Sequence, residues 1–223
     1  NTADTVATNA DNFHQFVLAK PDDIRGINMK CFVNAFQVNG NIAEDFKKLE
    51  CWPTIGIESL TRVQASEKGQ TNIEDNYNAL EVLAKHNLQM ILTFVIGLPG
   101  ETKNSLLADS NELINIVKKY KDNIYMITVS PLVVINGSKA FDKMFSILGG
   151  KLPKKHEEEF YNPLLLSELY FKNFTKITVE DAIRQICILE KRVVEINPKI
   201  GFDSKGLDSE KYFKIKKELR ANK

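Results

Sequence analysis

The chain has 223 residues, of which 43% are hydrophobic and 26% are charged, enough to bury the core of one ordinary globular domain. Its 30 basic and 29 acidic residues leave a net charge of +1, so the charge balance indicates no nucleic acid, acidic substrate or membrane surface as a partner. The apolar runs are short, and we expect neither a membrane span nor a secretory signal.

The number and spacing of the cysteines indicate the redox state of the compartment in which the protein works. The three cysteines, Cys31, Cys51 and Cys187, are odd in number and widely spaced, which does not fit a disulfide framework. We therefore expect a reducing compartment and a cytoplasmic protein. Each cysteine is predicted to be a small buried apolar residue, because no two are spaced as metal ligands are.

Hydrophobic periodicity predicts strands that alternate with amphipathic helices. The predicted order is helix 5–19, strand 27–37, a helix capped by Asn41, strand 51–59, a helix opened by a capping box at residues 71–74, strand 88–96, helix 103–120 and strand 124–129. Residues 140–223 show no clear strands, and a helix runs from Thr178 to about Ile196.

This alternation indicates parallel βαβ units and an α/β fold. We predict a partial parallel (β/α) barrel over residues 1–145 and a helical C-terminal extension over residues 146–223. In such a barrel the reactive groups lie at the C-terminal ends of the strands. The segments to inspect are therefore residues 34–39, 58–59, 97–101 and 130–137.

Two of these strand ends carry an unusual sequence. Residues 56–59 read GIES, and residues 94–102 read FVIGLPGET, with glycines that allow a tight turn and a close approach to the backbone. Together they resemble the radical S-adenosylmethionine (SAM) superfamily, and most of all its branch that often carries an upstream cobalamin-binding domain. Weaker similarity at residues 1–9, 68–71 and 132–141 extends the match over roughly residues 1–145.

The resemblance implies a cofactor set. Radical SAM enzymes hold a [4Fe–4S] cluster by three closely spaced cysteines, and reductive cleavage of SAM at this cluster gives a 5′-deoxyadenosyl radical. By the motif match, Glu58 and Ser59 lie beside the ribose and methionine of SAM, the edge from Val95 to Gly97 lies against the adenine, and Glu101 orders the turn. The expected SAM-binding residues are Glu58, Ser59, Val95, Gly97, Glu101 and Ser130.

The chain departs from the family in one large respect, since the three-cysteine motif and the glycine-rich motif for the SAM amine are both missing. Because the chain also starts at Asn1 rather than Met, we expect it to be the C-terminal part of a longer enzyme, unable to bind the cluster or turn over SAM alone. The whole enzyme would use SAM, the cluster and, in this branch, cobalamin. Its partners would be a reductant such as flavodoxin or ferredoxin and a substrate that is a small molecule, a lipid or a peptide.

Two other functions compete with this interpretation. A cluster-free barrel module could keep the scaffold for binding or scaffolding alone, and the missing cysteines favour it. An ordinary β/α-barrel lyase or aldolase needs a Schiff-base lysine or a metal site at the strand ends. Lys30 lies too early in its strand for that role, so we rank this alternative last.

Overall fold

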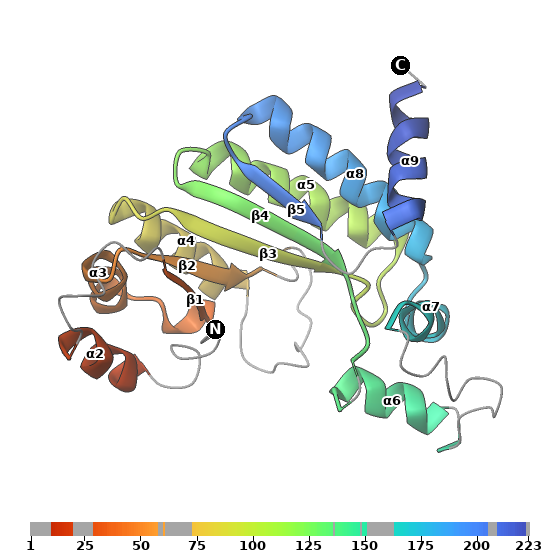
Figure 1. Ribbon diagram of the computed structural model, residues 1–223, viewed down its shortest axis with the longest axis horizontal. Coiled ribbons are helices and arrows are strands. Elements are labelled where there is room, and N and C mark those ends of the chain that lie inside the picture. Colours follow the sequence, from red (N-terminus) through yellow and green to blue (C-terminus); the bar gives the residue numbers. More distant parts are fainter. Residues whose placement is uncertain are drawn as a thin grey trace.

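A computed structural model describes residues 10–19, 29–57, 60, 73–135, 137–147, 149–150, 163–204 and 209–221. Its centre is a sheet of five strands in the order β1-β2-β3-β4-β5, and every neighbouring pair is parallel. The strands are β1 (Met29–Val33), β2 (Cys51–Gly56), β3 (Met90–Ile96), β4 (Ile124–Pro131) and β5 (Gly201–Ser204) (Figure 1). The chain is thus an α/β protein with the parallel sheet of a partial barrel.

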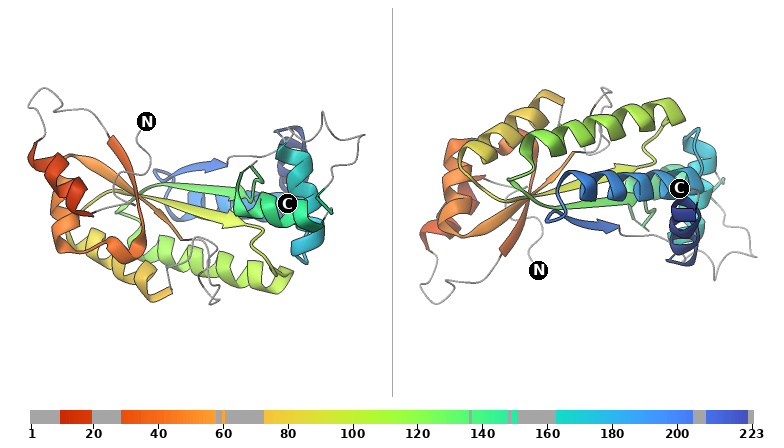
Figure 2. Two further views of the ribbon diagram at one scale, coloured as in Figure 1. Left: turned by 90° about the horizontal axis from the view of Figure 1, so that it is seen from below. Right: turned by 90° about the horizontal axis from the view of Figure 1, so that it is seen from above.

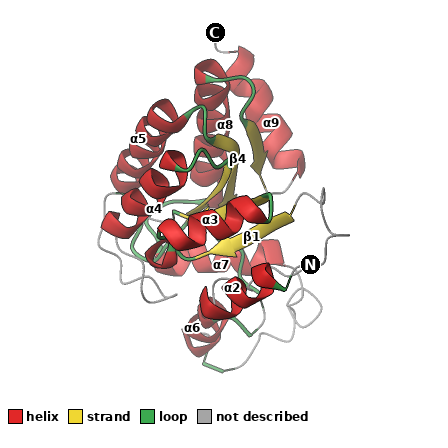
Figure 3. Ribbon diagram, turned by 90° about the vertical axis from the view of Figure 1, so that its left-hand side faces the viewer, coloured by secondary structure: helices red, strands yellow, loops and turns green. Residues whose placement is uncertain are grey.

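The helices lie mainly along one side of the sheet, beside β1 and near the C-terminal ends of the strands. The views in Figure 2 show α4 and α5 along one side of it, and the view from the β1 side shows α3 beside β1 with α2 below (Figure 3). In Figure 1, α6 and α7 lie near the C-terminal ends of β3 and β4. The helices are α2 (Ala10–Leu18), the 3-10 turn η2 (Ala35–Gln37), α3 (Gly40–Lys48), α4 (Ile73–Lys85), α5 (Lys103–Tyr120), α6 (Lys139–Ile147), α7 (Pro163–Phe174), α8 (Val179–Ile196) and α9 (Ser209–Ala221).

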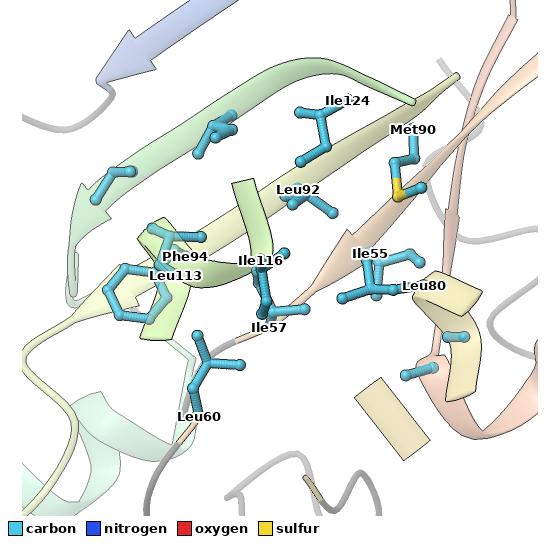
Figure 4. Packing of buried hydrophobic residues seen from close by; sticks show 14 of the residues in the cluster. Ile55, Ile57, Leu60, Leu80, Met90, Leu92, Phe94, Leu113, Ile116 and Ile124 are labelled. Carbon is cyan, nitrogen blue, oxygen red and sulfur yellow. The ribbon is translucent and has the colours of Figure 1, made fainter. Parts of the chain in front are cut away.

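The main core lies between the sheet and the helices α4 and α5. Alternate residues of β3, namely Leu92, Phe94 and Ile96, are buried, as expected for one face of a strand. They belong to one apolar cluster that also contains side chains of β2, α4 and α5 (Figure 4). The neighbours labelled there include Ile55, Leu80, Leu113 and Ile116.

The opposite face of the sheet is more open. Thr93 and Val95, which alternate with the buried residues of β3, are only half-buried. Phe32 on β1 and Tyr125 on β4 are 42% and 41% exposed. In a (β/α) barrel this face of the sheet lines the interior. A bound molecule would lie where this face meets the C-terminal ends of the strands.

Several predicted elements are confirmed. Helix 103–120 is α5, and the strands predicted at 88–96 and 124–129 are β3 and β4. Thr178 caps α8, with its side chain accepting a hydrogen bond from the Asp181 N–H. Within the described ranges, no helix combines the length and the apolar character needed to cross a membrane.

Other predictions need correction. Asn39, not Asn41, caps α3, because its side chain accepts a hydrogen bond from the Ile42 N–H. The strand predicted at 27–37 is shorter, since β1 ends at Val33 and the 3-10 turn follows. The helix predicted at 5–19 is α2, and residues 5–9 lie outside the described residues, as do residues 71–72 of the predicted capping box.

The expectation that no strand follows residue 140 is wrong. β5 pairs with β4 in parallel, with Gly201 opposite Met126 and Ser204 opposite Val129. This strand has only four residues, none of them fully buried, so it shows neither alternation nor a continuous apolar run. The C-terminal part of the chain therefore extends the sheet as well as adding helices.

Candidate functional site

The glycine-rich segment after β3 forms a closed turn. Gly97 and Gly100 both have positive φ angles, of 103° and 77°. The Gly97 N–H donates to Oε2 of Glu101 at 2.5 Å, and the Glu101 N–H donates to the Leu98 carbonyl at 3.0 Å. Glu101 is 2% exposed, so its carboxyl group lies inside the turn and holds both ends of it together.

A helix that is distant in sequence but adjacent in space leaves no room for a side chain at position 97. An added Cβ at Gly97 would lie 2.2 Å from the nearest ring carbon of Phe171, which is on α7. Phe171 is 1% exposed and belongs to the main core cluster, so displacing the ring would disturb the packing of the core. The backbone of this turn is therefore in direct contact with the C-terminal helices.

Two backbone hydrogen bonds fasten the turn to the connection between α7 and α8. The Gly100 N–H donates to the Phe174 carbonyl at 2.7 Å, and the Lys176 N–H donates to the Glu101 carbonyl at 2.7 Å. This attachment was not predicted from the sequence, because hydrogen bonds between backbone atoms of two loops do not require particular residue types in the sequence. The leucine and aromatic residues of α7 are the sequence features that indicate burial of this helix.

The turn leads directly into α5. Thr102 is the N-cap, and Thr102 and Ser105 exchange the two hydrogen bonds of a capping box. Lys103 forms an ion pair with Asp181 of α8 at 2.8 Å. Although partial burial opposes it, hydrogen bonds from Lys103 and Thr178 lower the pKa of Asp181 below its ordinary value. The first turns of α5 and α8 are thus linked next to the strand ends.

The structure brings Val95 and Ser130 together. They are register partners on β3 and β4, and both are half-buried on the open face of the sheet. One residue beyond Pro131, the Leu132 N–H donates to the Ile96 carbonyl at 2.6 Å, which keeps the two strand ends adjacent. Val95, Ser130 and the Gly97 turn therefore share one edge of the sheet.

Glu58 and Ser59 lie outside the described residues, so their predicted role is neither supported nor opposed by the geometry. The strand before them is described. Gly56 is the register partner of Thr93, and the Ile57 N–H donates to the Thr93 carbonyl at 2.9 Å. β2 therefore ends beside β3, at the same edge of the sheet as the glycine turn.

The cysteines do not gather into a metal site. Cys31 and Cys51 lie on the neighbouring strands β1 and β2, while Cys187 belongs to a small separate cluster with Ile183 and Ile215. All three are free and buried, as predicted. A hydrogen bond between the first two thiols lowers the pKa of Cys31 and raises that of Cys51. Among the described residues no group of three histidine, cysteine or acidic side chains could hold a metal ion, so they do not fit an iron–sulfur cluster.

Comparison with known proteins gives structural but no sequence relatives. No family model matches the chain, and no curated protein matches it significantly. The N-terminally truncated Elp3 of the archaeon Methanocaldococcus infernus superposes with a TM-score of 0.59 at 13% identity, over 88% of this chain and 42% of Elp3. The radical SAM methyltransferase TsrM of Kitasatospora setae, solved with cobalamin and a [4Fe–4S] cluster, gives a TM-score of 0.46 at 16% identity.

The TsrM likeness is too weak to carry an argument, whereas the Elp3 likeness covers most of the chain. At 13% identity it establishes the fold alone, and that fold agrees with the partial parallel (β/α) barrel predicted from the sequence. The chain spans less than half the length of this Elp3 structure, with 42% covered. Activity, cofactors and partners are therefore argued below as proposals.

Proposed function

We propose that this chain forms the SAM-binding wall of a radical SAM enzyme. The observation that carries the proposal is the Gly97 turn, with the buried carboxyl group of Glu101 bound to its backbone at the C-terminal end of β3. Cofactors of parallel barrels bind at this end of the strands. The two sequence motifs and the fold shared with Elp3 support the same conclusion.

In this proposal each residue has a defined task. The open face at Val95 and Ser130 receives the adenine, and the glycine turn lets it approach the backbone closely. Glu101 holds the turn in shape from inside, while Glu58 and Ser59 bind the ribose and methionine moiety. SAM, when bound beside a [4Fe–4S] cluster, supplies radical chemistry that no side chain of this chain provides.

The described residues do not fit the cluster, and in this proposal its ligands come from another part of the whole enzyme. We derive no catalytic step through the cluster and assign no residue of this chain to cobalamin. The proposal places the whole enzyme in a reducing, cytoplasmic setting with a flavodoxin-like or ferredoxin-like reductant. Its substrate, whether small molecule, lipid or peptide, would meet the same edge of the sheet.

A direct test measures binding of SAM and of S-adenosylhomocysteine to the full chain by calorimetry. The variant Val95→Trp places a large ring on the open face, and we expect it to abolish binding. Val194→Trp makes the same change on the outer surface of α8, where Val194 is 46% exposed, and should bind like the unchanged chain. Equal binding by both variants would contradict the placement of the site.

The second candidate function is a cluster-free module that binds a partner without SAM, and the wide spacing of the three cysteines favours it. To separate the two, the chain is expressed with and without the coding sequence that precedes it and reconstituted anaerobically with iron and sulfide. Formation of 5′-deoxyadenosine from SAM by the longer form supports the radical SAM proposal. Failure of both forms to bind or cleave SAM supports the cluster-free module.

A further inference from the structure

Asp109 is a buried acidic residue in the middle of α5. It is 1% exposed, and its Oδ1 accepts a hydrogen bond from the backbone N–H of Leu60 at 3.1 Å, across 49 positions in the sequence. Leu60 is itself 3% exposed and belongs to the main core cluster (Figure 4). Burying a carboxyl group costs free energy unless hydrogen bonds compensate for the lost water, so this contact marks a specific structural role.

The hydrogen bond between Leu60 and Asp109 matters because Leu60 lies just after the end of β2. Leu60 is the third residue after Ile57, whose own N–H is bound by the Thr93 carbonyl. The chain is therefore anchored on both sides of residues 58–59, to β3 at Ile57 and to α5 at Leu60. The first anchor continues the sheet, whereas the second is made by the side chain of Asp109.

The helix that supplies this anchor also begins at the glycine turn. α5 starts directly after its N-cap Thr102, which follows Glu101, and Asp109 lies about two helical turns further on, roughly 10 Å along the axis. α5 is capped at Thr102 and buries one face in the core, so it forms a rigid connection over this length. Through α5, the end of β2 is thus held at a fixed position relative to the turn that follows β3.

A second contact strengthens this arrangement. Tyr77 of α4 donates its hydroxyl hydrogen to Oε1 of Glu112 on α5 at 2.5 Å. Asp109 and Glu112 are three residues apart and lie on the same side of the helix. α5 therefore contacts Leu60, which follows β2 in the chain, and also the second turn of α4.

We infer that Asp109 is a positioning residue, which holds the exit of β2 in register with the Gly97 turn so that the two strand ends form one binding surface. The anchoring role follows from the Leu60 contact by itself. Its consequence for SAM rests on the proposed function, and the two are tested by different measurements.

The experiment compares Asp109→Ala, Asp109→Asn and Ser110→Ala in the full chain. The asparagine keeps an acceptor oxygen, whereas the alanine removes it. Ser110 is the matched control, since it is the next residue of α5, is 0% exposed, and its hydroxyl makes no hydrogen bond with any described residue. Amide hydrogen exchange is measured at Leu60, with the Ile127 amide in β4 reporting global unfolding, and calorimetry gives the Kd for SAM.

We expect Asp109→Ala to speed exchange at Leu60 at least about tenfold more than at Ile127, with Asp109→Asn restoring much of the protection and Ser110→Ala leaving it unchanged. The Kd for SAM should rise about tenfold in the alanine variant and less in the asparagine variant, at a temperature where each variant is fully folded. If Asp109→Ala fails to fold, Asp109→Leu, which also lacks an acceptor but fills more of the space, replaces it in the comparison with Asp109→Asn and Ser110→Ala.

Each other outcome contradicts a separate claim. Unchanged exchange at Leu60 in both Asp109 variants overturns the anchoring role. Altered exchange with an unchanged Kd overturns the link between Asp109 and the binding surface. If the unchanged chain binds no SAM, the proposed function fails while the exchange measurement still decides whether Asp109 anchors β2.

Discussion

Gly97 has a backbone φ of 103° and lies against the ring of Phe171. Both facts disfavour a residue with a Cβ, one through backbone strain and the other through overlap with a buried ring. Gly100 meets only the first condition, because nothing lies within 4 Å of its added Cβ. Comparing substitutions at Gly97 and Gly100 therefore distinguishes the cost of backbone strain from the cost of overlap with Phe171.

Gly97→Ala should lower the free energy of unfolding by about 3 kcal/mol or more, from strain and overpacking together. Gly100→Ala should cost only about 1 kcal/mol, from strain alone. Urea titration followed by circular dichroism measures both. Equal losses in the two variants would show that the ring of Phe171 moves away at little cost.

At the scale of elements, α8 begins with a cap that also holds α5. Thr178 and Asp181 exchange the hydrogen bonds of a capping box, and Asp181 pairs with Lys103. The pKa of Asp181 is lowered by these contacts, against the opposing effect of burial, so the folded state prefers the ionised carboxylate. This contribution to stability is present above the ordinary carboxyl pKa and is lost as the pH falls through the lowered value.

Asp181→Asn should therefore flatten the loss of stability that the unchanged chain shows as the pH falls below about 4. Glu180→Gln, at the neighbouring exposed residue, removes only a surface ion pair with Arg184 and serves as the control, because such pairs contribute little to stability. Urea unfolding from neutral to acid pH provides the measurement. A profile that is identical in the Asp181 variant would rule out this carboxylate as a source of the acid sensitivity.

The contact between α4 and α5 predicts the opposite pH dependence. Burial, followed by the hydrogen bond to Glu112, raises the pKa of Tyr77 well above its ordinary value. The folded state thus keeps the neutral phenol, and this stabilisation is lost as the pH rises above about 10, where the unfolded chain loses the proton first. Tyr77→Phe should show a shallower alkaline decline in the free energy of unfolding than the unchanged chain.

Tyr125→Phe is the control for this measurement, because Tyr125 is 41% exposed on the open face of the sheet. Its alkaline profile should match that of the unchanged chain. An unaltered slope in Tyr77→Phe would mean that this phenol titrates alike in the folded and unfolded states.

At the scale of the whole molecule, the C-terminal third completes the structure around the glycine turn. α8 contributes Ile186, Leu189 and Val193 to the main core cluster, and β5 pairs with β4. The backbone around Phe174 and Lys176 binds the turn itself. The predicted domains are a barrel part at 1–145 and an extension at 146–223. Each of the contacts just described joins a residue of the extension to a residue of the barrel part.

A fragment ending at residue 145 should therefore lose cooperative unfolding, since it would expose the apolar face covered by α8 and leave the edge of β4 unpaired. A chain ending at residue 204 lacks α9 but keeps α7, α8 and β5, and it should still unfold cooperatively. Near-ultraviolet circular dichroism during urea titration distinguishes the two. Cooperative unfolding of the shorter fragment would establish residues 1–145 as an independent domain.

The sequence by itself determined the parallel α/β class, the central elements and the position of the glycine turn. These follow from local causes, because apolar periodicity marks β3 and α5 and the paired glycines mark the turn between them. The same local reasoning placed Gly97, Glu101 and Ser130 at strand ends, and the structure shows them with Val95, named from the motif resemblance, along one edge of the sheet.

Only the tertiary structure decided which distant segments complete this edge. The ring of Phe171 over Gly97, the backbone bonds from Phe174 and Lys176, and the contact of Asp109 with Leu60 join positions far apart in the sequence. β5 is also a product of long-range pairing, because four half-exposed residues carry too little apolar pattern to predict a strand. Such contacts depend on where elements meet in space, and that information is not contained in local periodicity.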